Sequence, residues 1–172
     1  MKSKYLFLTL IFSLFVNQMV FAQSSNKKAD KDTFEWRYEI EVFGQGVQGT
    51  YQVKVWSYSK KTETALEQAK KNAVHGVVFK GFPSKGQLEG KSALATSPNV
   101  EQEKEDFFRE FFANGGKYLK YVTVANNGAL GAGDVIKIGK EYKVGVVISV
   151  NVAMLRKDLE DAGIIKGLSN GF

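Results

Sequence analysis

The sequence predicts an α+β fold, a two-layer sandwich in which two or three helices pack on a mainly antiparallel sheet of about five strands. Three observations lead to this prediction. Several segments alternate apolar and polar residues with the period of two that is typical of a strand with one buried face. Other segments repeat apolar residues with helical spacing. Short connections containing glycine join neighbouring strands, which favours antiparallel pairing.

The N-terminal segment 1–22 has the pattern of a cleavable secretory signal peptide. Lys2 and Lys4 precede an uncharged apolar run that ends at Val16, and Ala22 supplies the small residue that a signal peptidase recognises. The run is shorter than the roughly 20 apolar residues of a membrane-spanning helix, so cleavage is favoured over a retained anchor. We therefore expect an exported protein, in the periplasm or outside the cell.

The rest of the chain predicts one domain. Residues 23–33 are polar and lack periodicity, so we expect a flexible lead-in before a single α+β domain at 34–165 and a C-terminal tail at 166–172. The chain contains no cysteine, which excludes disulfide bonds and the lipidated cysteine of a lipoprotein. Its net charge of +6 falls to a mild +4 when Lys2 and Lys4 are removed with the signal peptide, and basic and acidic residues are interleaved. This pattern favours a soluble protein over one that binds nucleic acid.

Two alternating segments, 34–43 and 50–58, predict a hairpin at the start of the domain. We set Gly44 opposite Gly49 because the residues between them are typical of a turn. This register pairs Tyr38 with Val55 on the buried face, and Glu39 with Lys54 and Arg37 with Trp56 on the other face.

Helical spacing predicts three helices after the hairpin. They lie at about 61–79, from Ser97 or Asn99 to Ala113, and beyond residue 152. The first has alanines on one stripe, which would let it lie close to the sheet. Three further strands are predicted at the following positions: 118–125, 134–138 and 141–152.

Four phenylalanines are the most distinctive feature of the second predicted helix: Phe107, Phe108, Phe111 and Phe112. Large aromatic residues dominate core burial, so the favoured interpretation is that most of them pack on the sheet. The alternative is a helix that contacts a partner, for which Phe108 and Phe112 are the candidate residues. Exposure of two or more rings would favour that alternative.

Trp56 and Tyr58 lie on the polar face of the second strand, close to Arg37 in the predicted register. Exposed aromatic rings beside charges are suited to stacking on a sugar or a cell-wall fragment. A cation–π contact with Arg37 accounts for the same residues without a ligand, and we favour it. All three residues remain candidates for binding a partner.

The sequence lacks the motifs of most enzymes and metal sites. His75 is the only histidine, no serine lies in a G-x-S-x-G context, and a structural histidine is favoured over a catalytic one. Without cysteine, zinc is disfavoured. The glycine-rich segment 128–133 lacks the lysine of a phosphate-binding loop and precedes a strand, so we expect a connecting loop and no cofactor. Acidic residues within 101–110 favour a solvated helix over paired catalytic carboxylates.

Part of the chain resembles small exported domains of the bacterial envelope. The resemblance is carried by a strand, a helix and a closing strand: Val42-Phe43-Gly44-Gln45-Gly46, then Ala65, Ala69, Ala73 and Val77-Val78-Phe79, then 146–152 with Leu155 and Leu159. These features are similar to the N-terminal domain of the flagellar accessory protein FlgT and to small outer-membrane lipoproteins. The resemblance implies a non-catalytic assembly or binding role and transfers no catalytic residue.

Three functional hypotheses remain. The leading one is a soluble accessory module that binds another envelope protein or a cell-wall component. The second is a carboxylate-based hydrolase acting on an envelope or extracellular glycan, which would need a pocket with two carboxylates, one of them with a raised pKa. The third is a structural subunit that self-associates through an unpaired sheet edge.

Overall fold

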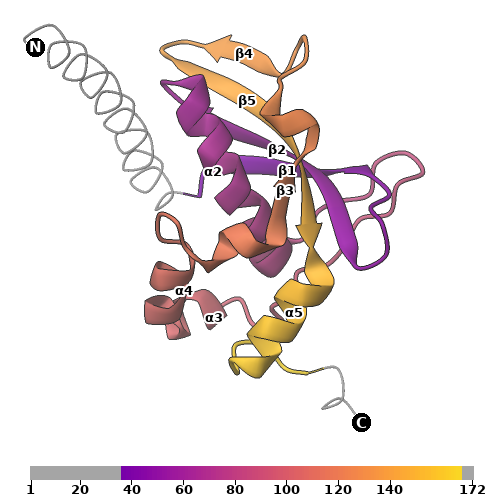
Figure 1. The fold of residues 1–172 in the computed structure, drawn as a ribbon, viewed down its shortest axis with the longest axis vertical. Coiled ribbons are helices and arrows are strands. Elements are labelled where there is room, and N and C mark those ends of the chain that lie inside the picture. Colours follow the sequence, from indigo (N-terminus) through magenta and orange to yellow (C-terminus); the bar gives the residue numbers. More distant parts are fainter. Residues whose placement is uncertain (1–35, 168–172) are drawn as a thin grey trace, which may run out of the picture.

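The computed structural model describes residues 36–167, which form the predicted α+β fold around an antiparallel sheet of five strands (Figure 1). The strands are β1 (Tyr38–Gly44), β2 (Thr50–Ser59), β3 (Val122–Val124), β4 (Val135–Ile138) and β5 (Glu141–Asn151). The α-helices are α2 (Thr62–His75), α3 (Val100–Glu103), α4 (Glu105–Phe111) and α5 (Val152–Asp161), with shorter helical turns η1 (Gly76–Lys80), η2 (Lys117–Tyr121) and η3 (Ala125–Gly128). The predicted signal peptide and lead-in lie outside the described residues.

Strand β5 organises the sheet, because it pairs with three other strands. One edge of β5 pairs with β2, which in turn pairs with β1, so that the strand order is β1-β2-β5-β3. The other edge of β5 is shared by two short strands, β4 near its beginning and β3 near its end. All of these pairs are antiparallel, as the hairpin pattern of the sequence predicted.

The hairpin of β1 and β2 keeps the predicted faces but not the predicted register. Tyr38 pairs with Ser57 instead of Val55, which is a shift of two residues along β2. The turn, in which the backbone N–H of Thr50 donates to the carbonyl oxygen of Val47, leaves Gly44 opposite Gln52 instead of Gly49, a shift of three residues. The irregularity between Val42 and Gly44 then reduces the shift to two. An even shift preserves the pleat, so the same side chains still point to the core.

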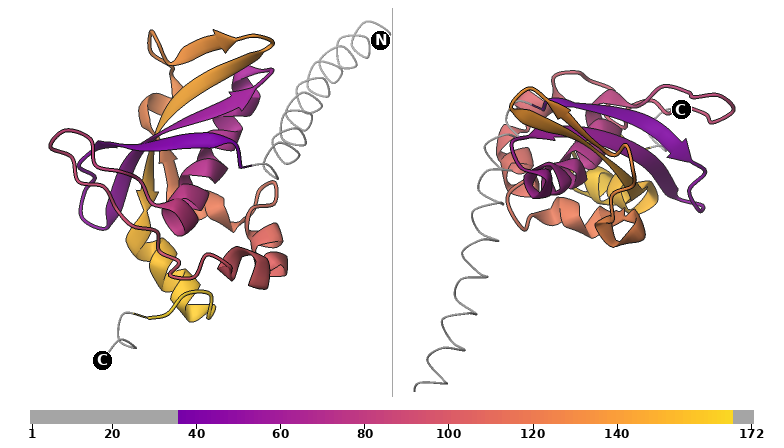
Figure 2. Two further views of the ribbon diagram at one scale, coloured as in Figure 1. Left: turned by 180° about the vertical axis from the view of Figure 1, so that it is seen from behind. Right: turned by 90° about the horizontal axis from the view of Figure 1, so that it is seen from above.

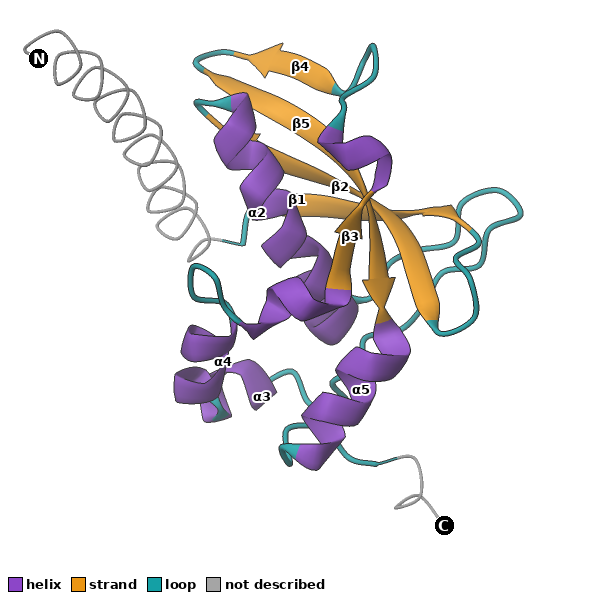
Figure 3. Cartoon of the chain, in the orientation of Figure 1, coloured by secondary structure: helices purple, strands orange, loops and turns teal. Residues whose placement is uncertain are grey.

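Helix α2 covers one face of the sheet, which we call the inner face (Figures 1 and 3). Its three stripe alanines, Ala65, Ala69 and Ala73, are completely buried. Where α2 continues into η1, the backbone comes so close to β1 that a Cβ atom added at Gly76 would lie 2.6 Å from Cδ1 of Ile40. Small residues therefore set the separation of the two layers, as the sequence indicated.

Two of the predicted elements are interrupted. The second predicted helix is divided at Lys104 into α3 and α4. The predicted strand at 118–125 begins instead as the turn η2, and only the last part is extended, as β3. Tyr118 and Tyr121 explain the change, because three-residue spacing on η2 lets both rings reach the core.

Candidate functional site

The face of the sheet opposite α2, which we call the outer face, is the candidate site. No described helix crosses it, and in the view from behind β1 passes in front of α2 (Figure 2). Alternation along three neighbouring strands brings one row of side chains to this face: Glu39 and Glu41 from β1, Lys54, Trp56 and Tyr58 from β2, and Lys143 from β5.

Trp56 lies against Gly145 at the centre of the outer face. These two residues are direct cross-strand partners, and a Cβ atom added at Gly145 would lie 2.7 Å from Cζ3 of the indole ring. The missing side chain therefore makes room for the ring. The ammonium groups of Lys54 and Lys143 lie 4.5 and 5.2 Å from the ring centre. Two lysines therefore make cation–π contacts with Trp56, whereas the predicted register placed Arg37 beside it.

Arg37 contacts Tyr58 rather than Trp56, as a consequence of the shifted register. Its guanidinium carbon lies 4.5 Å from the centre of the Tyr58 ring, and its Nη2 donates to Oε2 of Glu141. Arg37 therefore makes the expected kind of cation–π contact, but with Tyr58 and not with Trp56. The Tyr58 hydroxyl donates to Glu39, and this hydrogen bond raises the pKa of Tyr58.

The charges of the outer face are neutralised in pairs. Lys143 donates to Glu39 at 2.8 Å, and Lys85 donates to Glu41 at 2.7 Å. These hydrogen bonds are the largest of the effects that lower the pKa of each glutamate. Both carboxylates are therefore ionised at neutral pH, whereas a hydrolytic carboxylate pair needs one group to hold its proton.

A hollow of about 280 Å³ opens beside these residues, between the sheet and the glycine-rich segment. Phe43, Leu130 and Asp134 are among its lining residues. The carboxylate of Asp134 stabilises the glycine-rich segment. It accepts from the backbone N–H of Gly131 at 2.7 Å, within the segment, and from Nζ of Lys54 at 2.6 Å. Residues 129–133 form a loop, as the sequence predicted, and Asp134 ties the end of this loop to Lys54 of β2.

A second cluster, which sequence analysis missed, surrounds His75 beneath the start of β1. Nδ1 of His75 lies 2.6 Å from the hydroxyl of Tyr38, and Nε2 lies 3.2 Å from a carboxylate oxygen of Glu101. The ring of Trp36 stacks on the imidazole at 3.7 Å between centroids. Residues from β1, α2 and α3 meet here, and their wide separation in the chain gave no signal in the sequence.

Burial determines the protonation of this His75 cluster. Only 2% of His75 is exposed, and burial lowers its pKa, so the imidazole is neutral. Burial also raises the pKa of Tyr38, so its hydroxyl keeps the proton and donates to Nδ1, while Nε2–H donates to Glu101. Since both imidazole nitrogens are engaged and Trp36 stacks on the ring, His75 joins β1, α2 and α3.

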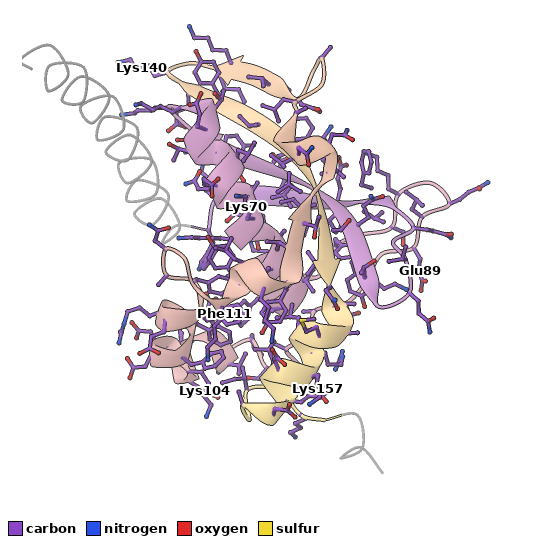
Figure 4. The ribbon with its side chains drawn as sticks, viewed as in Figure 1. Lys70, Glu89, Lys104, Phe111, Lys140 and Lys157 are labelled. Atoms are coloured by element: carbon purple, nitrogen blue, oxygen red, sulfur yellow. The ribbon has the colours of Figure 1, made fainter. Side chains whose placement is uncertain are left out.

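The phenylalanine stripe lies in the core, as the favoured interpretation predicted, but its rings contact Phe79 of η1 and the tyrosines of η2 instead of packing on the sheet. Phe108 is 4% exposed and Phe112 is 6% exposed, so neither is available to a partner, and both are corrected as candidate binding residues. Phe111 points inward among the helices (Figure 4). Its ring stacks on Tyr121 at 5.9 Å, so the stripe is covered by the turn η2.

Neither a metal site nor a membrane-spanning helix is found in the part of the chain that the structure describes. Within residues 36–167 no three histidine, cysteine or acidic side chains converge as metal ligands would. Over the same residues no helix combines the length and the apolarity that a bilayer crossing requires.

Comparisons with known proteins give no relative from which a role could be transferred. No family model, no curated protein and no solved structure matches this chain.

Proposed function

We propose that this protein is an exported, non-catalytic binding module that attaches to another component of the bacterial envelope through the outer face of its sheet. One observation carries the proposal. A face that no described helix covers holds two aromatic side chains, Trp56 and Tyr58, and paired charged side chains lie around them. Single apolar residues on a surface need no partner to explain them, but these two rings lie next to each other on one face. Protein interfaces, by contrast, combine aromatic residues and arginine with a polar rim.

A protein is favoured over a glycan as the partner. Sugars bind aromatic residues by stacking on a ring face, but cations already lie over both rings: Lys54 and Lys143 near Trp56, and Arg37 over Tyr58. A sugar would have to displace these cations. A protein side chain can instead enter the hollow beside Leu130 and leave the cation–π contacts in place.

Crosslinking in intact cells, followed by capture of the protein and identification of what is attached, tests the proposal. The informative variant is Trp56→Ala, and the matched control is Met154→Ala, because Met154 is an exposed apolar residue (38%) that lies on α5 and not on the outer face. We expect wild type and Met154→Ala to capture the same partner, and Trp56→Ala to capture about tenfold less of it, since central aromatic residues dominate interface energies.

Two outcomes would overturn the proposal. Equal capture by Trp56→Ala would show that the outer face is not the attachment surface. Release of soluble sugar from an envelope glycan by the purified protein would favour the hydrolase hypothesis, and the carboxylates of the outer face would then need to be replaced one at a time.

A further inference from the structure

Strand β4 is an edge strand with an unusual degree of exposure. Three of its four residues are apolar, yet Val135, Ile136 and Ile138 are 39%, 43% and 49% exposed. Within the described residues β4 pairs only with β5, so its other edge has no strand beside it. An exposed apolar edge strand is a template on which another strand can pair.

The hydrogen bonding of the β4–β5 hairpin shows which backbone groups are free. The N–H of Gly145 donates to the carbonyl oxygen of Asp134 at 2.8 Å, so these two residues form a hydrogen-bonded pair. Such pairs alternate along an antiparallel ladder, which makes Ile136 with Lys143 and Ile138 with Glu141 the next two. The backbone groups of Val135 and Lys137 therefore point away from β5, toward the open edge.

The charge of this edge indicates what would pair with it. Lys137 is exposed on β4, and Lys140 is exposed at the tip of the hairpin (Figure 4). The two carboxylates of the hairpin face other partners: Asp134 pairs with Lys54, and Glu141 pairs with Arg37. The edge thus presents two lysines for which the described residues supply no carboxylate.

We propose that β4 is a docking strand, which binds an extended segment of the partner protein that alternates acidic and apolar residues. This inference rests on the proposed function and specifies how the partner is held. The backbone of the segment would pair with Val135 and Lys137, and its carboxylates would neutralise the two lysines. A second copy of this chain fits less well, because it would bring its own Lys137 and Lys140 to the same edge.

The docking strand is continuous with the outer face. Ile136 lies beside Lys143 in the register, and Ile138 lies beside Glu141, so the side chains of both isoleucines extend the row that holds Tyr58. A strand added at β4 would enlarge the same surface, and its apolar side chains would contact the two exposed isoleucines. One partner can therefore engage the edge and the outer face together.

A peptide of seven residues that alternates glutamate with valine is the probe, and the same peptide with lysine in place of glutamate is its control. Binding to the purified protein is followed by amide NMR and by hydrogen exchange. We expect the acidic peptide to bind, the basic peptide not to bind, and the amides of Val135 and Lys137 to become protected. Protection of those two amides distinguishes strand pairing from adhesion to lysines.

Two substitutions at Lys137 distinguish the contribution of backbone pairing to peptide binding from that of the lysine charge. Lys137→Pro removes the outward N–H without removing a donor to β5, and Lys137→Ala removes only the charge. We expect Lys137→Pro to weaken peptide binding about tenfold and Lys137→Ala to weaken it about threefold. Unchanged amide signals from β5 in Lys137→Pro would show that the hairpin is intact.

Three results would overturn the docking strand. The first is equal binding of the acidic peptide by Lys137→Pro and wild type. The second is peptide-induced protection elsewhere in the protein. The third is dimerisation of Lys137→Ala in the ultracentrifuge without peptide binding, which would mean that the lysine only prevents self-pairing. If cellular capture still depends on Trp56 while Lys137→Pro has no effect, the proposed function stands and only the docking strand fails.

Discussion

Two clusters of this protein use nearly the same residue types in opposite environments. The His75 cluster combines Trp36, Tyr38 and a glutamate, and the outer face combines Trp56, Tyr58 and a glutamate. In the buried cluster the largest effect on the pKa of Tyr38 and His75 is burial. On the outer face the largest effect is hydrogen bonding: the bond to Glu39 for the pKa of Tyr58, and the bond from Lys143 for the pKa of Glu39. Composition alone therefore does not distinguish a structural cluster from an accessible surface.

The position of each tyrosine relative to water explains the contrast. Tyr38 points its hydroxyl at a histidine that water does not reach, so each polar atom of the His75 cluster depends on the others. Tyr58 points its hydroxyl at Glu39, whose side chain is 57% exposed and is also bound by Lys143. Loss of one contact on the outer face leaves partners that water or a lysine can satisfy.

The largest effect that we expect separates the two tyrosines by removing only their hydroxyl groups. Tyr38→Phe leaves Nδ1 of His75 buried without a hydrogen-bond donor, which costs about 2 kcal/mol of unfolding free energy. Tyr58→Phe leaves Glu39 with Lys143 and water, and should cost less than about 0.5 kcal/mol. Urea denaturation of both variants measures the difference. Equal losses would mean that the two clusters do not differ in this way.

An intermediate effect tests how Trp56 is accommodated on the outer face. Gly145→Ala places a Cβ atom 2.7 Å from the indole ring, so the ring must move, and we expect a loss of about 1 kcal/mol and a shift in tryptophan fluorescence. Introduced together with Trp56→Ala, the same alanine should cost much less, because only Cε of Lys54, near the flexible end of its side chain, remains 2.7 Å from the new Cβ atom. A double-mutant cycle measures this coupling. Independent effects of the two substitutions would show that Gly145 does not serve the ring.

These two tests concern contacts that sequence analysis could anticipate to different degrees. Faces of strands were predictable because alternation depends on local pattern: Glu39 and Trp56 point outward as expected, although the register between them shifted by two residues. The shift depends on the irregularity near Val42 and on the turn at Val47, which alternation does not encode. The exposure of Ile136 and Ile138 was likewise hidden, because an apolar strand in the sequence does not reveal whether another element will cover it.

The candidate site was predictable in part for the same reason. Arg37, Trp56 and Tyr58 were found because they are large or charged residues at outward positions of the alternating pattern, on β2 and just before β1. The His75 cluster required a contact between β1, the end of α2 and the start of α3, and no local pattern predicts a contact over such distances. Phe108 and Phe112 do have a local pattern, but it is ambiguous, because aromatic residues have the same helical spacing in a core and in an interface.

The smallest effect that we expect distinguishes the clusters by pH. Burial lowers the pKa of His75 below its ordinary value of 6.5, so the unfolded chain takes up this proton at a higher pH than the folded protein. The contribution to stability is therefore complete above pH 6.5 and declines as the pH falls below it. Glu101 opposes the effect of burial on His75, and Lys80 adds to it, which keeps the net change small.

The outer face should lose stability only in a more acidic range. The pKa of Glu39 is lowered from its ordinary value of 4.5, so its contribution is present above that pH and is lost as the pH falls through the lower, folded value. Because His75 is the only histidine of the chain, the decline between pH 6.5 and 4.5 should be absent in His75→Gln, whereas the decline at lower pH should persist. Urea midpoints measured across this range provide the test. A slope that survives in His75→Gln would assign the decline to groups outside the His75 cluster, and the comparison of the two clusters would then have to rest on the tyrosine variants alone.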